Sequence, residues 1–218
     1  MDKYANYKEL SAHQQIGKDY TIHIQYALPD IVILAIHGGR IEAGTSEIAR
    51  GIAGERWSFY DFRGKKKKNN RDLHITSTCF DEPRALNLVA HASRVVTVHG
   101  TKGDKPFVYL GGRDEALLKK TRLYLLDASF PVGVTPGRLK GTDPKNIVNR
   151  GARGKGLQIE LTRGMRSELF KDLSRPGGSE PSPRFQPFVE AIRSAIHSLP
   201  QKKASGLIRT LFLCFAPF

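Results

Sequence analysis

The chain has 218 residues, of which 39% are hydrophobic and 26% are charged. This composition excludes a disordered or fibrous chain and predicts a single globular domain over residues 1–218. The 35 Lys and Arg residues outnumber the 21 Asp and Glu residues and give a net charge of +14, which should attract polyanions such as nucleic acid, anionic lipid or an acidic polymer. Two cysteines are too few for a disulfide scaffold, and no apolar signal core stands at the N-terminus, so we expect a cytoplasmic protein, with release on cell lysis left open.

The N-terminal part predicts a polar arm and two strands. Residues 1–19 are polar and should form a short helix or an arm on the surface. Apolar and polar residues alternate from 20 to 26, which is typical of a half-exposed strand. Residues 31–36 are an unbroken apolar run rich in β-branched side chains, which indicates a strand buried on both faces in a parallel sheet.

A polar motif follows this buried strand at once. The strand stops at His37, and the two glycines behind it allow the backbone to turn sharply. Glu42 lies in the short loop, and Thr45 or Ser46 is expected to cap a helix over residues 46–55. A strand, a turn with potential ligands and a helix are therefore predicted.

The next segment is basic and then alternating. Residues 57–62 predict a strand, and the lysine-rich residues 64–71 are interpreted as a solvated hairpin tip rather than a specific polyanion contact. Residues 73–78 alternate and predict another strand, on which His74 shares a face with Thr76 and Thr78. A hydrogen bond from His74 to one of these hydroxyls is favoured over a place in the site.

A second histidine ends a second buried strand. A helix over 81–92, capped by Asp81, leads into the β-branched run 95–98, which ends at His99. Parallel strands present their carboxyl ends at one edge of a sheet, so His37 and His99 should emerge together beside Glu42. Histidine nitrogen and glutamate oxygen are zinc ligands, and catalytic zinc sites typically have three protein ligands. A metal site is therefore predicted, although single histidines at strand ends are also common as hydrogen-bonded structural residues.

The C-terminal half predicts a basic loop and a strand with a buried carboxylate. A strand over 107–110 and an amphipathic helix over 115–128 precede the Gly- and Pro-rich residues 131–156. Long basic loops of this kind are more often functional than structural. In the strand 157–162, Glu160 faces away from the leucines and isoleucine, and in a covered sheet such a carboxylate must be paired, bound to metal or functional.

The end of the chain predicts a linker over residues 174–187 and a last amphipathic helix over 188–199. The tail over residues 201–218 contains an apolar stretch that is too short to span a bilayer. Its role is not indicated by the sequence.

Four segments together resemble the phage-type poly-γ-glutamate hydrolases. They are the motif from His37 to Glu47, the strand end at His99, residues 73–78, and the segment around Glu160. The resemblance runs from about Tyr20 to the last helix. It implies an α/β fold similar to zinc carboxypeptidases, with a mixed, mostly parallel central sheet flanked by helices.

The resemblance also implies an activity. His37, Glu42 and His99 would hold zinc, and Glu160 would be the general acid/base in the hydrolysis of γ-glutamyl amide bonds of poly-γ-glutamate, a capsular polymer that phages attack. Each residue of this polymer keeps a free α-carboxylate, and the planar guanidinium of arginine suits carboxylates.

Candidate substrate-binding residues are the arginines near Glu160 and beside the other site loops, namely Arg150, Arg153, Arg163 and Arg63, together with Arg40. Two alternatives stay open. One is a basic nucleic-acid-binding protein of phage replication without catalysis, for which no recognition motif is found. The other is a zinc peptidase or deacylase that acts on small acidic amides. No membrane partner is expected, and the oligomeric state is not indicated.

Overall fold

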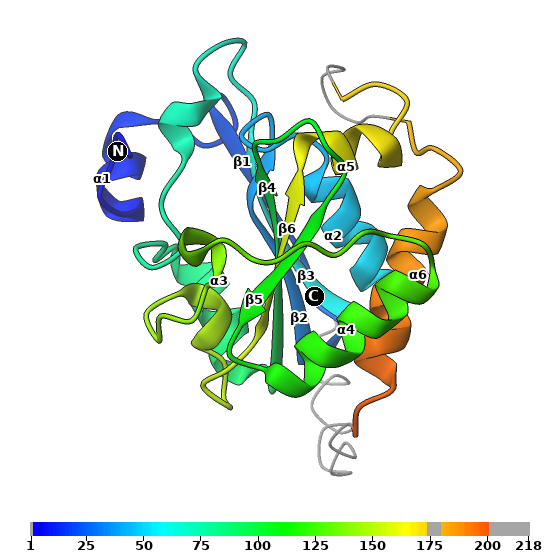
Figure 1. The fold of residues 1–218 in the computed structure, drawn as a ribbon. Coiled ribbons are helices and arrows are strands. Elements are labelled where there is room, and N and C mark those ends of the chain that lie inside the picture. Colours follow the sequence, from blue (N-terminus) through cyan, green and yellow to red (C-terminus); the bar gives the residue numbers. More distant parts are fainter. Residues whose placement is uncertain (1, 174–179, 201–218) are drawn as a thin grey trace, which may run out of the picture.

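A mixed sheet of six strands forms the centre of the molecule, and helices cover both of its faces (Figure 1). The computed structural model describes residues 2–173 and 180–200. The strand order is β1-β3-β2-β4-β6-β5. The strands are β1 (Tyr20–Gln25), β2 (Leu28–Gly39), β3 (Trp57–Gly64), β4 (Arg94–Thr101), β5 (Val108–Gly112) and β6 (Leu157–Thr162).

The four inner strands are parallel, and the two edge strands run antiparallel to them. Strand β2 pairs in parallel with both β3 and β4, and β4 pairs in parallel with β6. Strands β1 and β5 pair antiparallel with β3 and β6. The predicted α/β class and the mixed, mostly parallel sheet are therefore confirmed. The unbroken apolar runs occupy the inner strands because those strands are buried on both faces.

Two hydrophobic cores lie on opposite faces of the sheet, because successive residues of a strand point to opposite sides. Ile31 and Ile33 of β2 pack with α2 (Thr45–Ala53), α4 (Glu115–Asp127), α5 (Arg163–Leu169) and α6 (Phe185–His197). Val32 and Leu34 pack on the other face with α1 (Tyr7–His13) and α3 (Pro83–His91). Short 3-10 helices at Asn70–Leu73, Gly137–Leu139 and Ile147–Asn149 complete the chain path.

Two predicted helix caps are wrong by one residue or more. Helix α2 follows Gly44, which has a positive φ of 92° and forms no side-chain cap. The Ser46 hydroxyl instead donates to Asp61 of β3 and accepts from Gly39 N–H. At α3 the cap is Glu82, whose carboxylate accepts from Ala85 N–H. Asp81 accepts from the backbone of Tyr7 instead, a long-range contact that competes with local capping.

The predicted strand over 73–78 is also wrong. The segment leaves the 3-10 helix Asn70–Leu73 and continues without pairing to any strand of the sheet. Its alternation arises because Leu73 and Ile75 are fully buried under the sheet, while His74 between them points into the site and Thr76 is exposed. Only residues 74–76 lie between the 3-10 helix and the turn at 77–79, so the alternation needs no strand partner.

The N-terminal arm is more firmly attached than the predicted surface arm. Leu10 is fully buried and Tyr4 is nearly so, both in the core beside α3. In Figure 1 helix α1 lies on the same side of the sheet as α3. Within the described ranges, no helix is long and apolar enough to cross a membrane. The tail over residues 201–218 and part of the predicted linker, 174–179, lie outside the described residues.

Candidate metal centre

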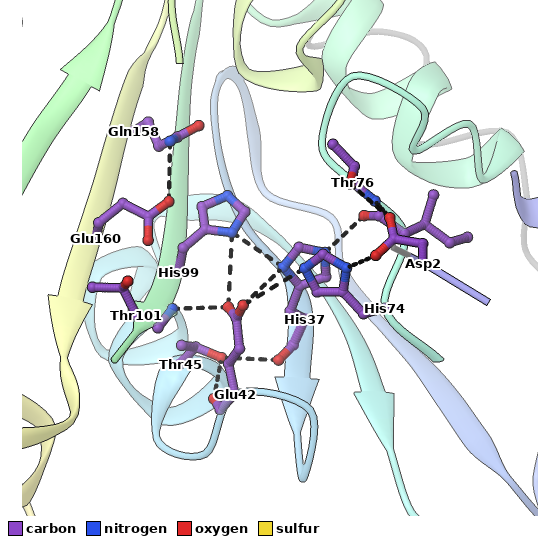
Figure 2. A network of polar contacts seen from close by, with 12 residues as sticks. Asp2, His37, Glu42, Thr45, His74, Thr76, His99, Thr101, Gln158 and Glu160 are labelled. Carbon is purple, nitrogen blue, oxygen red and sulfur yellow. Dashed lines mark hydrogen bonds and ion pairs between the residues drawn. The ribbon is translucent and has the colours of Figure 1, made fainter. Parts of the chain in front are cut away.

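Three side chains converge where β2 and β4 end, as the sequence predicts (Figure 2). His37 is carried by β2 and His99 by β4, and the parallel pairing of the two strands brings both to one edge. Glu42 lies in the loop after β2, which is closed by a hydrogen bond from Glu42 N–H to the carbonyl of His37 (2.9 Å). The hydroxyl of Thr45 donates to the carbonyl of Glu42 (2.8 Å) and fixes the same loop.

The turn after His37 requires glycine for a physical reason. A Cβ on Gly38 would lie 1.9 Å from the Oδ1 of Asp61 and 2.3 Å from the Oγ of Ser46. Gly39 has a positive φ of 62°, which favours glycine. The two glycines therefore let β3 and α2 approach the end of β2 closely enough to place Glu42 over His37.

The donor atoms have the spacing of a tetrahedral metal site. The two histidine Nδ1 atoms are 3.2 Å apart. The Nδ1 of His37 lies 3.3 Å from the Oε1 of Glu42, and the Nδ1 of His99 lies 3.8 Å from its Oε2. Ligands bound to zinc at roughly 2.0 to 2.1 Å in a tetrahedron stand about 3.3 Å from one another. The three residues therefore fit zinc.

At His37 a hydrogen bond leaves the correct nitrogen free for metal. The Nε2 of His37 lies 2.8 Å from the carbonyl of Ile75. A carbonyl only accepts, so this nitrogen carries the proton and Nδ1 keeps its lone pair. Glu42 is held from its other side because its Oε2 accepts from Gly100 N–H (2.8 Å).

The electrostatics of Glu42 and His99 also favour metal binding. Burial raises the pKa of the Glu42 carboxyl, but the interactions with His37 and His99 and the hydrogen bond from Gly100 outweigh it and lower that pKa to about 2. Burial, reinforced by His37, lowers the pKa of His99 to about 3. An ionised carboxylate and neutral imidazole are the forms that bind metal.

His74 lies in the site, contrary to the favoured sequence interpretation. Its ring stacks on that of His37, with 3.9 Å between the ring centroids. The partner of its Nδ1 is the Oδ1 of Asp2 (2.7 Å) rather than a threonine hydroxyl. Burial lowers the pKa of His74 to about 4, so the ring is neutral near pH 7. No local pattern in the sequence links Asp2 to a residue so far along the chain.

Glu160 stands beside His99 on the neighbouring strand, in direct register with it. Gln158 donates from Nε2 to the Oε1 of Glu160 at 3.1 Å (Figure 2). Burial and the nearby Glu42 raise the pKa of Glu160 to about 8, although Arg138 and Arg166 oppose the shift. A carboxyl with such a pKa can hold or release a proton near neutral pH.

A cleft of about 1380 Å³ opens over these groups, and its lining is basic. Seven Lys and Arg residues line it against four Asp and Glu residues. Of the arginines predicted to bind substrate, Arg163 and Arg40 line the cleft. The others lie outside the lining formed by the described residues: Arg150 is exposed, Arg153 pairs with Asp114 (3.0 Å), and Arg63 pairs with Asp61 (2.9 Å).

Sequence reasoning did not single out three cleft arginines, which are Arg71, Arg138 and Arg166. Arg138 and Arg166 belong to the basic segment that the sequence marks as functional. The charge of that segment indicates a functional region but does not show which of its arginines line the cleft. Arg166 is 8% exposed and donates to the carbonyls of Ala43 and Thr101. Only the folded chain brings this side chain from α5 to the loop that carries Glu42 and to the end of β4.

Comparison with known proteins agrees with this geometry. The family model described as "Poly-gamma-glutamate hydrolase" matches residues 4–191. A prophage-derived protein of Bacillus subtilis (strain 168), YoqZ, is 36% identical over 178 residues, which cover 81% of this chain and 64% of that protein. The chain thus spans less than two thirds of the length of YoqZ. A second protein of the same organism, YndL, is 36% identical over 194 residues, which cover 88% of this chain and 76% of YndL.

Two solved structures share the whole fold. A bacteriophage poly-gamma-glutamate hydrolase superposes with a TM-score of 0.87 at 31% identity and covers 91% of this chain and 98% of its own. A zinc-free apo form of YndL superposes with a TM-score of 0.85 at 34% identity and covers 90% of this chain and 98% of its own. The resemblance seen in the sequence is thereby confirmed, and the chain belongs to the poly-γ-glutamate hydrolase family, a family of hydrolases.

Proposed function

We propose that this protein is a zinc-dependent hydrolase of the γ-glutamyl amide bonds of poly-γ-glutamate. The observation that carries the proposal is the convergence of His37, Glu42 and His99, with donor atoms all within 4.8 Å of one another, at the floor of a basic cleft. Glu160 faces the same cleft. Membership of the family supports the substrate, and the zinc-free form described for YndL supports the metal.

His37 and His99 would hold zinc through Nδ1 and Glu42 through its carboxylate. A zinc ion in this position would lower the pKa of a water molecule and polarise the scissile carbonyl. Glu160 would accept the proton of the attacking water and pass it to the leaving amine. Its raised pKa, about 8, makes both protonation states accessible at neutral pH, and the hydrogen bond from Gln158 would orient the carboxyl.

The charge of the cleft suits the substrate. Poly-γ-glutamate is a polyanion with one free carboxylate on each residue, and arginine binds carboxylates through two parallel hydrogen bonds. Arg138 and Arg163 are exposed side chains of the cleft wall and are the best placed for this contact. Arg150, Arg153 and Arg63 remain proposed contacts only for polymer residues that extend beyond the cleft.

The proposal is tested by metal content and polymer length together. Purified protein should carry close to one zinc per chain, and it should shorten poly-γ-glutamate on a gel until EDTA is added. His37→Ala should lose the zinc and the activity, since removal of one of three protein ligands ruins an open site. His23→Ala is the matched control because the His23 side chain is exposed on β1 and bonds the hydroxyl of Thr21, away from the cleft.

Other outcomes would point to the alternatives. Zinc-free protein with full activity would contradict the metal assignment. Zinc-loaded protein that cleaves small acidic amides but leaves the polymer intact would be a peptidase or deacylase. Absence of any cleavage together with tight DNA binding at about 0.15 M ionic strength would favour the nucleic-acid-binding alternative.

A further inference from the structure

Asp2 of the N-terminal arm reaches across the chain to the edge of the metal centre. Its Oδ1 lies 2.7 Å from the Nδ1 of His74. Its Oδ2 accepts from both the backbone N–H and the hydroxyl of Thr76, each at 2.6 Å. Figure 2 shows Asp2 on the far side of His74 from Glu42. Both oxygens of this carboxylate are therefore used on the segment that carries His74.

Contacts independent of the site hold the arm in place. Lys3 forms an ion pair with Asp72 (2.9 Å), and Tyr4 is 6% exposed in the core. The backbone of Tyr7 donates to Asp81 (2.6 Å). The arm thus contacts Asp72 and Asp81, which flank the segment 74–76 in the sequence. These contacts give Asp2 a defined position. The match to the family model begins at residue 4, so Asp2 lies outside it.

The contact determines which nitrogen of His74 carries the proton. A carboxylate only accepts, so the Nδ1 of His74 must donate to Asp2, and in the neutral ring Nε2 keeps the lone pair. The ring is held flat against His37, with an interplanar angle of 24°. Its Nε2 stands 3.9 Å from the Oε1 of Glu42, on the side of the cleft that His74 lines.

We infer that Asp2 is a positioning residue, which orients His74 and fixes its tautomer so that Nε2 faces the cleft as a hydrogen-bond acceptor for the N–H of a bound amide. This inference rests on the proposed function, since the amide is that of the substrate. Neutral imidazole is suited to the role because it accepts at one nitrogen while the other is held by a fixed partner. The N-terminal arm is then a part of the active site.

The experiment compares three variants of the arm in the zinc-loaded protein. Asp2→Ala removes the carboxylate, Asp2→Asn keeps an acceptor oxygen, and Lys3→Ala breaks the neighbouring ion pair of the arm without touching His74. Long-range ¹H–¹⁵N spectra of the histidine rings report which nitrogen of His74 is protonated, and a His74→Gln spectrum assigns the signal. Zinc content, kcat and KM are measured on the same samples.

We expect the Nδ1–H tautomer of His74 in the parent protein and in Lys3→Ala, and a mixture of tautomers in Asp2→Ala. The kcat/KM for poly-γ-glutamate should fall by about tenfold or more in Asp2→Ala, since loss of a group that orients a site residue typically costs 10 to 100-fold. Asp2→Asn should recover part of that loss. Zinc content should stay near that of the parent protein in all three.

Three results would overturn the inference. They are an unchanged His74 tautomer in Asp2→Ala, a changed tautomer with unchanged kcat/KM, and equal losses in Asp2→Ala and Lys3→Ala, which would mean that the arm contributes stability alone. If the parent protein does not cleave the polymer, the proposed function fails first. The tautomer spectra still decide in that case whether Asp2 orients His74.

Discussion

A substitution at Glu160 should separate zinc binding from the chemical step most clearly. Glu160→Gln keeps the size of the side chain and its bond to Gln158 but cannot accept a proton. Turnover of poly-γ-glutamate should therefore fall by a factor of about 100 to 10,000, the usual contribution of a general acid or base. Zinc content should persist, which metal analysis checks. Loss of zinc would instead make Glu160 a ligand, and unchanged turnover would remove it from the mechanism.

The same side chain predicts how stability depends on pH when no metal is bound. Burial raises the pKa of Glu160 from 4.5 to about 8, so the folded state holds this proton more tightly than the unfolded state. The resulting stabilisation is fully present below pH 4.5 and is lost as the pH rises through 8. The loss over this range is on the order of a few kcal/mol.

Melting curves in EDTA from pH 5 to pH 8 test this second prediction. The metal-free parent protein should lose more stability over that range than Glu160→Gln, in which the titrating group is absent. Glu180→Gln is the control, because Glu180 is exposed and forms a surface ion pair with Lys171. Identical pH slopes for the parent protein and Glu160→Gln would show that the carboxyl does not carry a raised pKa.

At the scale of elements, the junction of β2, β3 and α2 should tolerate no added methyl group. Gly38→Ala would place a Cβ against the buried carboxylate of Asp61 and the hydroxyl of Ser46. We expect a loss of about 1 to 3 kcal/mol in the free energy of unfolding and weaker zinc binding, because Glu42 moves with this turn. Denaturant melts and zinc titration measure the two effects.

Gly137→Ala is the matched control for this substitution. A Cβ on Gly137 would meet nothing within 4 Å, and its φ is not positive. Its stability should stay within about 0.5 kcal/mol of the parent protein, as for an ordinary surface change. Equal effects of the two substitutions would show that the close approach at Gly38 does not constrain the site.

The elements differ in how well their sequences predict them, and the reason is the range of the contacts involved. The strands that end at His37 and His99 are predictable because burial on both faces leaves a continuous apolar run. The segment 73–78 fails because its alternation comes from contacts with the core rather than from a strand partner. Ser46 and Asp81 fail as caps for a related reason, because each bonds a group far away in the sequence, Ser46 the carboxylate of Asp61 and Asp81 the backbone of Tyr7.

The site shows the same division at the scale of the whole molecule. Two histidines at equivalent strand ends can be read from the sequence because parallel strands share an edge. The contact of Asp2 with His74 and the hydrogen bonds of Arg166 to the carbonyls of Ala43 and Thr101 depend on how loops and the arm fold back over the sheet. Charge counts located the basic segment but could not distinguish Arg138, which lines the cleft, from Arg150, which does not.

The basic residues behind the net charge of +14 should attract a polymeric anion at long range and bind it by direct contact. Added salt distinguishes these two effects. Charges spread over the surface attract the polymer at long range, and this attraction is largely screened at about 0.15 M ionic strength. Direct contacts between cleft arginines and substrate carboxylates are short and persist in salt. The double variant Arg138→Ala/Arg163→Ala should therefore raise KM by roughly tenfold, or lower kcat/KM equally, even at that ionic strength.

The matched control is Arg122→Ala/Arg150→Ala, which removes the same charge from two exposed arginines outside the cleft lining of the described residues. Its kcat/KM should fall at low salt and approach that of the parent protein as salt is added. Both double variants should keep their zinc, so a change in kcat/KM reports on substrate alone. If the control stays as impaired in salt as the cleft variant, Arg150 contacts the substrate as the sequence predicts, and the polymer extends beyond the cleft.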